Sequence, residues 1–149
     1  MRQRLSYALR CGMAVFAVAA CLLFVISGHA ASQQGDDTPK RSTLSGVFTQ
    51  AQAARGRDTY GGMCRSCHTP ESHAAPAFLN TWSGRPLWDL FLYVSGDMPK
   101  SDPGSLAPNE YAQVLAYLLE MNGMPAGKDE LPTDSLILKK IRFDTVSTR

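Results

Sequence analysis

Cysteine and histidine are scarce in this sequence, which has four cysteines and three histidines among 149 residues. Cys11 and Cys21 lie near the N-terminus, and the other pair, Cys64 and Cys67, is separated by only two residues. A disulfide between Cys64 and Cys67 would close a trivial loop and contribute little stability. The chain is therefore not a disulfide-stabilised scaffold.

A long apolar run is also missing. The longest, from Met13 to Ile26, falls short of the about 20 apolar residues that a membrane-spanning helix needs. It follows Arg2, Arg4 and Arg10 and precedes a stretch of small residues, which is the pattern of a secretory signal peptide. We predict a signal peptide over residues 1–30, cleaved after Ala30, and export to the periplasm.

Two alternatives to this cleavage remain open. Val18-Ala19-Ala20-Cys21 resembles a lipoprotein cleavage box, which would make Cys21 a lipid-bearing N-terminus, although the apolar run continues beyond it. An uncleaved segment over residues 11–26 would instead anchor the protein, and only then would a membrane be a partner.

An excess of positive charge is absent once the signal peptide is removed. The whole chain has 15 basic and 13 acidic residues. Loss of Arg2, Arg4 and Arg10 leaves 12 basic residues against 13 acidic ones, a net charge of −1. This balance gives no case for nucleic-acid binding. No acid–base constellation typical of an enzyme is visible either, so no catalytic residue is assigned.

The sequence does contain Cys64-Arg65-Ser66-Cys67-His68, in which the spacing Cys-x-x-Cys-His is typical of covalent attachment of a c-type haem. Two thiols one helical turn apart can each add to a vinyl group of the same porphyrin. His68 then lies under the iron and can supply the proximal ligand. We predict one covalently bound haem c.

Other readings of the cysteine pair are weaker. A thioredoxin-like redox pair should follow a strand in a β-α-β pattern, and no such pattern precedes Cys64. A zinc ion could enlist Cys64, Cys67, His68 and His73, but adjacent residues rarely reach one tetrahedral ion and a second Cys-x-x-Cys is missing. His73 lies among small and polar residues, and we expect it to be a solvated surface residue.

A methionine is the expected second axial ligand, because a thioether favours ferrous iron and His/Met ligation raises the reduction potential. Met98, followed by Pro99, lies outside helical periodicity, which argues against simple gap filling. Met124, also followed by a proline, is the competing candidate; Met63 and Met121 are weaker ones. The two leading candidates lie on either side of a predicted helix some 20 Å long, so only one of them can reach the iron. We favour Met98.

Two further residues are candidates for contacts with the cofactor and its ligand. A ligating histidine normally donates its second ring N–H to an acceptor. The carbonyl of Pro76 is our candidate acceptor for His68. Trp82 is a candidate donor, through its indole N–H, to a haem propionate.

Residues of high helix propensity predict a helix over 49–60. Apolar periodicity predicts two more, over 86–94 and 109–122, and the stretch over 69–80 is expected to be irregular. Gly61-Gly62 is expected to end the first helix. Gly56 inside it suggests close packing, for which the last helix, near Tyr117, is the expected partner. The apolar stripe of the last helix consists of Tyr111, Val114, Leu115 and Leu118.

The composition divides the chain into four parts. After the signal peptide, residues 31–46 are polar and are predicted to form a flexible linker. Residues 47–127 form the predicted haem domain. The tail over 128–149 is charged, with an apolar patch around 136–141 that either packs along the domain or extends from it.

The chain resembles class I c-type cytochromes, most of all the small monohaem cytochromes of bacterial periplasms, over about 47–127. The resemblance implies an all-α, cytochrome c-like fold around one haem, His68 and Met98 as axial iron ligands, and electron transfer between periplasmic redox proteins such as a dehydrogenase donor and an oxidase acceptor. Thr69 stands where the family often has glycine, and the loop to Pro76 is short. The matching segments are Gly56–Tyr60, Cys64–His68, Ala75–Phe78, Met98-Pro99, Pro103–Leu106, Glu110-Tyr111, Leu115–Leu119 and Asn122–Gly127.

Three functions are therefore weighed. The first is a periplasmic electron carrier that is not itself an enzyme. The second is a haem c subunit of a periplasmic dehydrogenase complex. The third is a haem sensor or enzyme with an open sixth site, which requires that Met98 does not bind iron.

Overall fold

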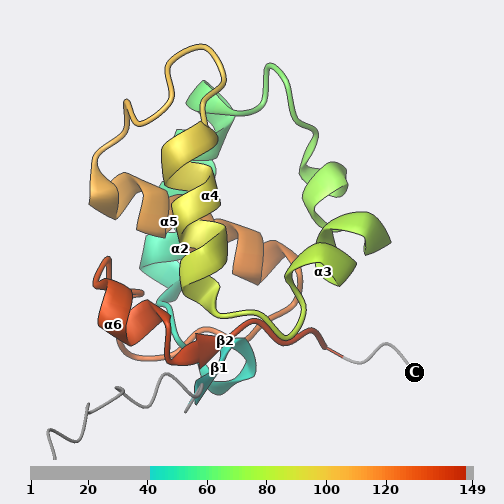
Figure 1. The fold of residues 1–149 in the computed structure, drawn as a ribbon, viewed down its shortest axis with the longest axis vertical. Coiled ribbons are helices and arrows are strands. Elements are labelled where there is room, and N and C mark those ends of the chain that lie inside the picture. The colour runs from blue at the N-terminus through green and yellow to red at the C-terminus, as the bar shows by residue number, and fades with distance from the viewer. Residues whose placement is uncertain (1–40, 147–149) are drawn as a thin grey trace, which may run out of the picture. The chain divides into compact units, whose positions relative to one another are not determined.

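The computed structural model describes residues 41–146, and this part of the chain is mainly helical (Figure 1). The prediction of an all-α fold is confirmed. The predicted signal peptide, with Ala30 and Cys21, and most of the predicted linker lie outside the described residues. Within 41–146 no helix is both long and apolar enough to cross a bilayer. The elements in chain order are β1 (Arg41–Ser42), the 3₁₀ helix η1 (Thr43–Ser45), α2 (Gln50–Met63), the 3₁₀ helix η2 (Pro70–His73), α3 (Pro76–Trp82), α4 (Leu87–Asp97), α5 (Pro108–Met121), α6 (Ser135–Leu138) and β2 (Ile141–Arg142).

Helix α2 begins where predicted but runs further. The Thr49 side chain accepts a hydrogen bond from the backbone N–H of Gln52 at 3.1 Å and so caps the first turn. The helix was expected to end at Gly61-Gly62, yet it continues to Met63. Both glycines are exposed and keep negative φ angles, so they weaken the helix without interrupting it. As a result, the cysteine motif starts directly at the C-terminal end of α2.

Helix α5 agrees closely with the predicted range of 109–122. Pro108 occupies its first turn, and the Glu110 carboxylate accepts a hydrogen bond from the N–H of Ala107 at 2.8 Å. Gly123 ends the helix with a φ of 77°, a left-handed conformation that favours glycine. The predicted stripe is buried along its length.

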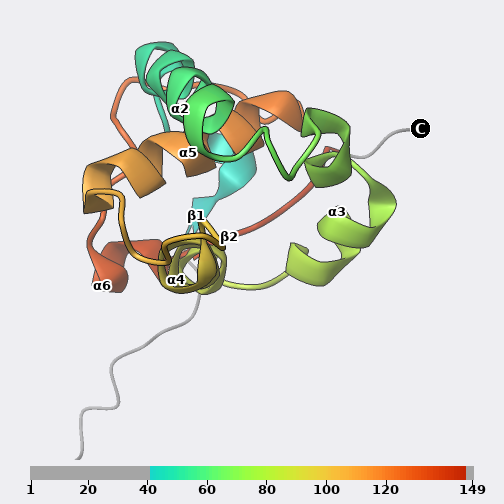
Figure 2. The same cartoon turned by 90° about the horizontal axis from the view of Figure 1, so that it is seen from above.

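Helices α2 and α5 lie against each other (Figure 2), and their backbones are in close contact at Gly56. A Cβ atom added to Gly56 would lie 1.8 Å from the backbone oxygen of Gln113, so any side chain there would force the helices apart. The predicted pairing of these helices is correct. The contact is at Gln113 and Val114, about one turn before the expected Tyr117.

The stretch between the cysteine motif and α4 is more ordered than predicted. Residues 69–80 were expected to be irregular, but they include η2 and most of α3, which ends at Trp82. Helix α4 was predicted over 86–94 and extends to Asp97, because the N–H of Met98 still bonds to the carbonyl of Val94 at 3.1 Å. Met98 therefore caps the C-terminus of a regular helix.

Both ends of the described region belong to the fold. Residues 41–46 are therefore part of the domain and not of a flexible linker, and the tail packs along the domain. The linker was predicted to reach residue 46. Instead, Arg41 and Ser42 pair in parallel with Ile141 and Arg142. The buried hydroxyl of Thr43 donates to the carbonyl of Asp144 at 2.7 Å and accepts from its N–H at 2.9 Å. Contacts between residues a hundred positions apart leave no local pattern in the sequence. The linker prediction rested on polar composition and could not detect them.

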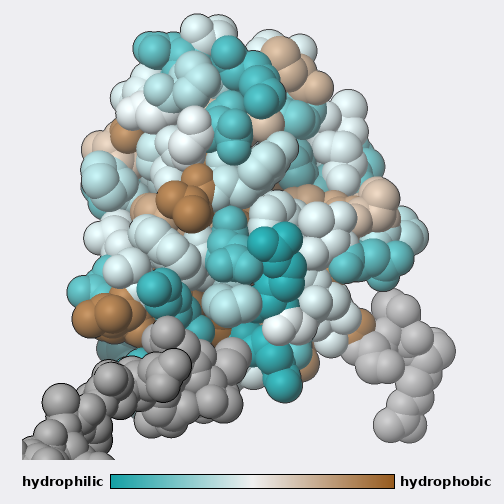
Figure 3. Space-filling model, viewed as in Figure 1, coloured by the Kyte–Doolittle hydropathy of each residue, from teal (hydrophilic) through white to brown (hydrophobic). Residues whose placement is uncertain are grey.

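The tail supplies part of the hydrophobic core. Its buried side chains are Leu131, Leu138, Ile141 and Phe143. The buried Gln52 side chain of α2 holds this segment, since its amide nitrogen donates to the carbonyl of Leu131 at 2.9 Å and its oxygen accepts from the N–H of Leu131 at 2.7 Å. On the face seen in Figure 3, apolar residues form separate patches, including one over α6, where Leu136 and Ile137 are exposed.

Candidate functional site

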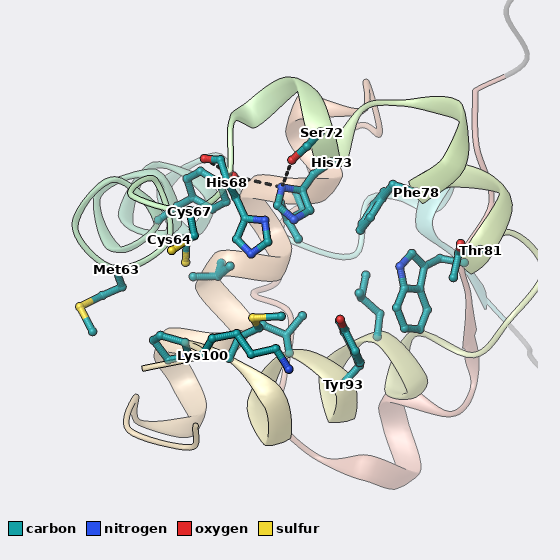
Figure 4. Close-up of a pocket in the computed structure, with 18 of the residues that line it drawn as sticks. Met63, Cys64, Cys67, His68, Ser72, His73, Phe78, Thr81, Tyr93 and Lys100 are labelled. Atoms are coloured by element: carbon teal, nitrogen blue, oxygen red, sulfur yellow. Dashed lines mark hydrogen bonds between the residues drawn. The ribbon is translucent and has the colours of Figure 1, made fainter. Parts of the chain in front are cut away.

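A cavity of about 770 Å³ collects most of the predicted site residues (Figure 4). The end of α2, the segment after it, α3, the end of α4 and α5 all contribute to its lining. A volume of this order falls within the range of small-molecule and cofactor pockets. Its apolar lining includes Phe78, Trp82, Leu90, Val94, Val114 and Leu118.

Cys64 and Cys67 lie at the edge of this cavity, on a tight turn that continues α2. The backbone N–H groups of Cys67 and His68 both bond to the carbonyl of Cys64, at 3.1 and 2.9 Å. Cys64 is half-buried, and this burial raises the pKa of its thiol, whereas Cys67 is exposed. The turn thus places two thiols and the following imidazole on one cavity wall.

His68 extends its imidazole ring into the cavity (Figure 4). Its ring lies beside that of His73, with 4.9 Å between the two ring centroids and an angle of 59° between their planes. The described residues contain no cluster of three or more histidine, cysteine or acidic side chains arranged for a metal ion. The zinc alternative therefore has no support in the geometry, and His68 is available to a cofactor inside the cavity.

Met98 also lines the cavity, and its backbone is anchored from α5. The Tyr111 hydroxyl donates a hydrogen bond to the carbonyl of Met98 at 2.8 Å. The sequence identifies Tyr111 only as part of the apolar stripe of α5, because this bond joins residues on different elements. A fixed backbone limits the positions open to the Met98 thioether.

The other methionines occupy different environments. Met124 is 4% exposed and packs in the hydrophobic core, and it is not among the residues that line the cavity. Met63 is at the cavity rim, but its side chain points outward and is 42% exposed (Figure 4). Met121 packs with a small cluster that contains Tyr60. Met98 is therefore the methionine whose surroundings suit a ligand inside the cavity.

Pro76 does not occupy the place predicted for it. It is exposed, begins α3 and is not among the residues that line the cavity. Because Pro76 is the first residue of α3, its carbonyl points along the helix axis toward the backbone N–H groups of the same helix. No hydrogen bond joins Pro76 to His68 in the described part of the chain.

Trp82 does line the cavity and is 8% exposed. Its ring packs against Phe78 and Tyr93, at centroid distances of 6.4 and 5.5 Å. The guanidinium of Arg85 lies 4.8 Å from the centroid of the Trp82 ring and is also bonded to the Asp89 carboxylate. Trp82 and Arg85 thus bring an indole N–H and a cation to the same end of the cavity.

His73 is not the solvated surface residue that the sequence suggested. It is partly buried and lines the cavity, where burial first, and then nearby His68, lowers the pKa of its imidazole. Its Nδ1 atom lies 3.0 Å from the Tyr60 hydroxyl, and its carbonyl accepts a hydrogen bond from the Asn122 side chain at 2.9 Å. Burial, and then Cys64, raises the pKa of Tyr60 to about 12. Because these partners come from α2 and the end of α5, no local pattern could reveal them.

The donor set tests whether this cavity suits a covalent porphyrin. Cys64 and Cys67 supply two thiols at the edge, and His68 and Met98 supply an imidazole and a thioether, which are ligands that haem iron accepts. Phe78, among others, provides the apolar surface that a porphyrin ring needs. The residues present therefore fit haem c.

Comparison with known families agrees with this geometry. The model of the family described as "Cytochrome C oxidase, cbb3-type, subunit III" matches residues 51–118. The match covers α2, the cysteine motif, α3, α4 and most of α5. No curated protein and no solved structure matches the chain.

Proposed function

We propose that the protein is an exported carrier of single electrons whose haem iron is bound by His68 and Met98. The match of residues 51–118 to a c-type cytochrome family implies covalently bound haem c. The observation that carries this proposal is the presence of both side chains on the lining of one cavity, next to Cys64 and Cys67. When bound, haem supplies an iron that cycles between the ferric and ferrous states.

The chain's residues hold the cofactor and limit its rearrangement. Cys64 and Cys67 would form the thioethers, so that the porphyrin stays fixed at the end of α2. His68 is held by a turn that continues α2, and Met98 by the cap of α4 and the Tyr111 hydroxyl. Ligands on anchored backbone keep similar positions in both oxidation states, which favours rapid electron transfer.

The cavity's surroundings support exchange with transient protein partners. Exposed Cys67 and Lys100 are at its rim, where a partner can approach the cofactor edge. The visible apolar patches are small and separate (Figure 3), as expected for a protein that forms brief redox encounters through small interfaces. The signal-peptide pattern over residues 1–30 supports a periplasmic location.

The test is an absorption spectrum of the protein matured in a host that attaches c-type haem. We expect a c-type haem spectrum in both oxidation states and, in the ferric state, the weak charge-transfer band of methionine-sulfur ligation. The double substitution Cys64→Ser and Cys67→Ser should abolish covalent attachment. Absence of covalent haem in the parent protein would refute the proposal.

A stable place in a larger oxidoreductase complex is the second candidate. The matched family takes its description from an oxidase subunit, which favours this role. Size-exclusion chromatography of protein extracted from its native cells separates the two candidates. A haem-containing peak at the size of a monomer supports the free carrier, whereas co-elution with a stoichiometric partner supports the subunit.

A further inference from the structure

One surface of the domain lies outside the cavity and combines exposed apolar side chains with cations. It is built from α6, the turn after it and the start of β1. This α6 face consists of Arg41, Leu136, Ile137, Lys139 and Lys140. None of these residues lines the cavity, so a partner bound here leaves the proposed haem site open.

The apolar part of the α6 face is formed by two side chains that point away from the core. Leu136 is 65% exposed and Ile137 is 45% exposed, whereas Leu138 on the same helix is fully buried. They make up the apolar patch over α6 in Figure 3. Removing such side chains from water is favourable, so the patch suits an apolar environment outside the domain.

The two lysines lie next to this patch. Lys140 is one helical turn after Leu136, and its backbone N–H bonds to the carbonyl of Ile137 at 3.0 Å, so all three residues share one side of the helical turn. Lys139 comes three residues after Leu136. Within residues 41–146, neither lysine forms an ion pair. Their charges are therefore available to an outside partner.

The other charges near the α6 face do not cancel those of the lysines. The backbone N–H of Arg41 bonds to the carbonyl of Lys140 at 2.9 Å, which places a third cation beside the pair. The Asp134 carboxylate accepts the first N–H groups of α6, at 2.7 and 3.1 Å. Asp144 is bonded to Arg142 at 2.8 Å. Residue 41 together with 134–144 contains four basic and two acidic side chains, a net charge of +2.

The N-terminal part of the chain joins the described domain at this face. Residues 1–40 precede Arg41, which pairs with β2 directly after the lysines. Fourteen residues, 27–40, separate Arg41 from the apolar run over 13–26 and reach at most about 50 Å when extended. If that run is an uncleaved anchor, the α6 face is the first part of the described domain that follows it.

We propose that the α6 face binds the surface of a bilayer that contains anionic lipids. Cations attract the anionic headgroups, and apolar side chains beside them enter the boundary between headgroups and acyl chains. A second copy of this chain fits the face less well, because a two-fold contact would bring its cations against each other. Binding here keeps the protein at the membrane while the cavity remains accessible to a soluble redox partner.

A nitroxide spin label at position 136 tests the contact directly. It is attached to the haem-loaded protein with Leu136→Cys, in which Cys11→Ser and Cys21→Ser remove the other thiols that thioethers would not occupy. With vesicles of phosphatidylglycerol and phosphatidylcholine, we expect the label to become more accessible to oxygen, which concentrates in bilayers, and less accessible to a polar nickel chelate. Vesicles of phosphatidylcholine alone should give a smaller change.

The matched control is the same label introduced by Leu92→Cys. Leu92 is 54% exposed, belongs to α4 and does not line the cavity, so its label should remain as accessible as in water. An unchanged label at position 136, or equal changes at both positions, would refute the proposal. Spin–spin broadening at position 136 without vesicles would identify a second copy as the occupant and would also refute it.

A lysine variant tests the role of charge with the same label. Lys140→Gln should lower the equilibrium constant for binding to the anionic vesicles about fivefold, and high salt should weaken binding further. Arg57→Gln removes an equal charge from α2 and should have little effect; equal losses in the two variants would refute a specific face. The label does not report iron ligation, so failure of the proposed Met98 ligation and failure of this inference are distinguishable.

Discussion

Met98 and Met124 differ in their surroundings, and this difference leads to a spectroscopic prediction. Met98 lines the cavity, whereas Met124 is packed in the core. We expect Met98→Ala to abolish the ferric methionine-sulfur band and to let the ferrous haem bind carbon monoxide, because the sixth position loses its ligand. Absorption spectroscopy of the two oxidation states checks this.

Met124→Ala is the matched control for the ligand assignment. It should keep the band while lowering the free energy of unfolding by about 2–5 kcal/mol, the usual cost of truncating a buried methionine. Thermal or denaturant unfolding measures that loss. The opposite pattern, with the band lost in Met124→Ala and kept in Met98→Ala, would make Met124 the ligand.

Tyr111 provides a prediction about how Met98 is held. The Tyr111→Phe substitution removes the hydroxyl that donates to the Met98 carbonyl at 2.8 Å and keeps the buried ring. We expect weaker sulfur ligation, seen as faster displacement of Met98 by an added ligand such as imidazole. The free energy of unfolding should fall by about 0.5–1.5 kcal/mol, the net value of one hydrogen bond. Unchanged displacement kinetics would show that the hydroxyl does not restrain Met98.

At the scale of elements, the pairing of α2 and α5 depends on the absence of a side chain at Gly56. In Gly56→Ala, the new Cβ would meet the Gln113 backbone, which cannot move as a flexible side chain does. We expect a loss of about 1–3 kcal/mol or more in the free energy of unfolding, together with a lower yield of haem attachment. Circular dichroism during thermal unfolding measures the first, and haem absorbance per protein measures the second.

Gly61 offers a control in the same helix. It is exposed, and an added Cβ would meet no atom within 4 Å. Gly61→Ala should therefore stabilise the protein by up to about 1 kcal/mol, because alanine has the higher helix propensity. Equal destabilisation by the two substitutions would show that close packing at Gly56 is not what the fold requires.

At the scale of the described domain, the tail after residue 127 contributes to stability. Leu138 is fully buried, whereas Leu136, on the same short helix, is 65% exposed. Leu138→Ala should lower the free energy of unfolding by about 2–5 kcal/mol, and Leu136→Ala should change it by less than about 0.5 kcal/mol. Denaturant unfolding of the two variants tests this. Similarly small losses in both would show that the tail does not contribute to the stability of the domain.

The sequence alone determined the features that rest on local chemistry. The spacing of Cys64, Cys67 and His68 specifies haem c, because attachment needs two thiols one turn apart beside an imidazole. The 3.6-residue periodicity of 109–122 identified α5 to within one residue at each end. Gly56 indicated close helix packing, because a glycine inside a helix destabilises it and a packing contact must offset that loss.

The tertiary structure decided what depends on residues far apart in the chain. Thr43 and Asp144 bond across the domain, and composition gave no sign that either segment is part of the fold. His73 had the neighbours of a surface residue in sequence, but Tyr60 and Asn122 hold it beside His68. Hydrogen bonds between residues far apart in the chain leave no periodic signal in the sequence, so the surroundings of the proximal histidine became visible only in the folded chain.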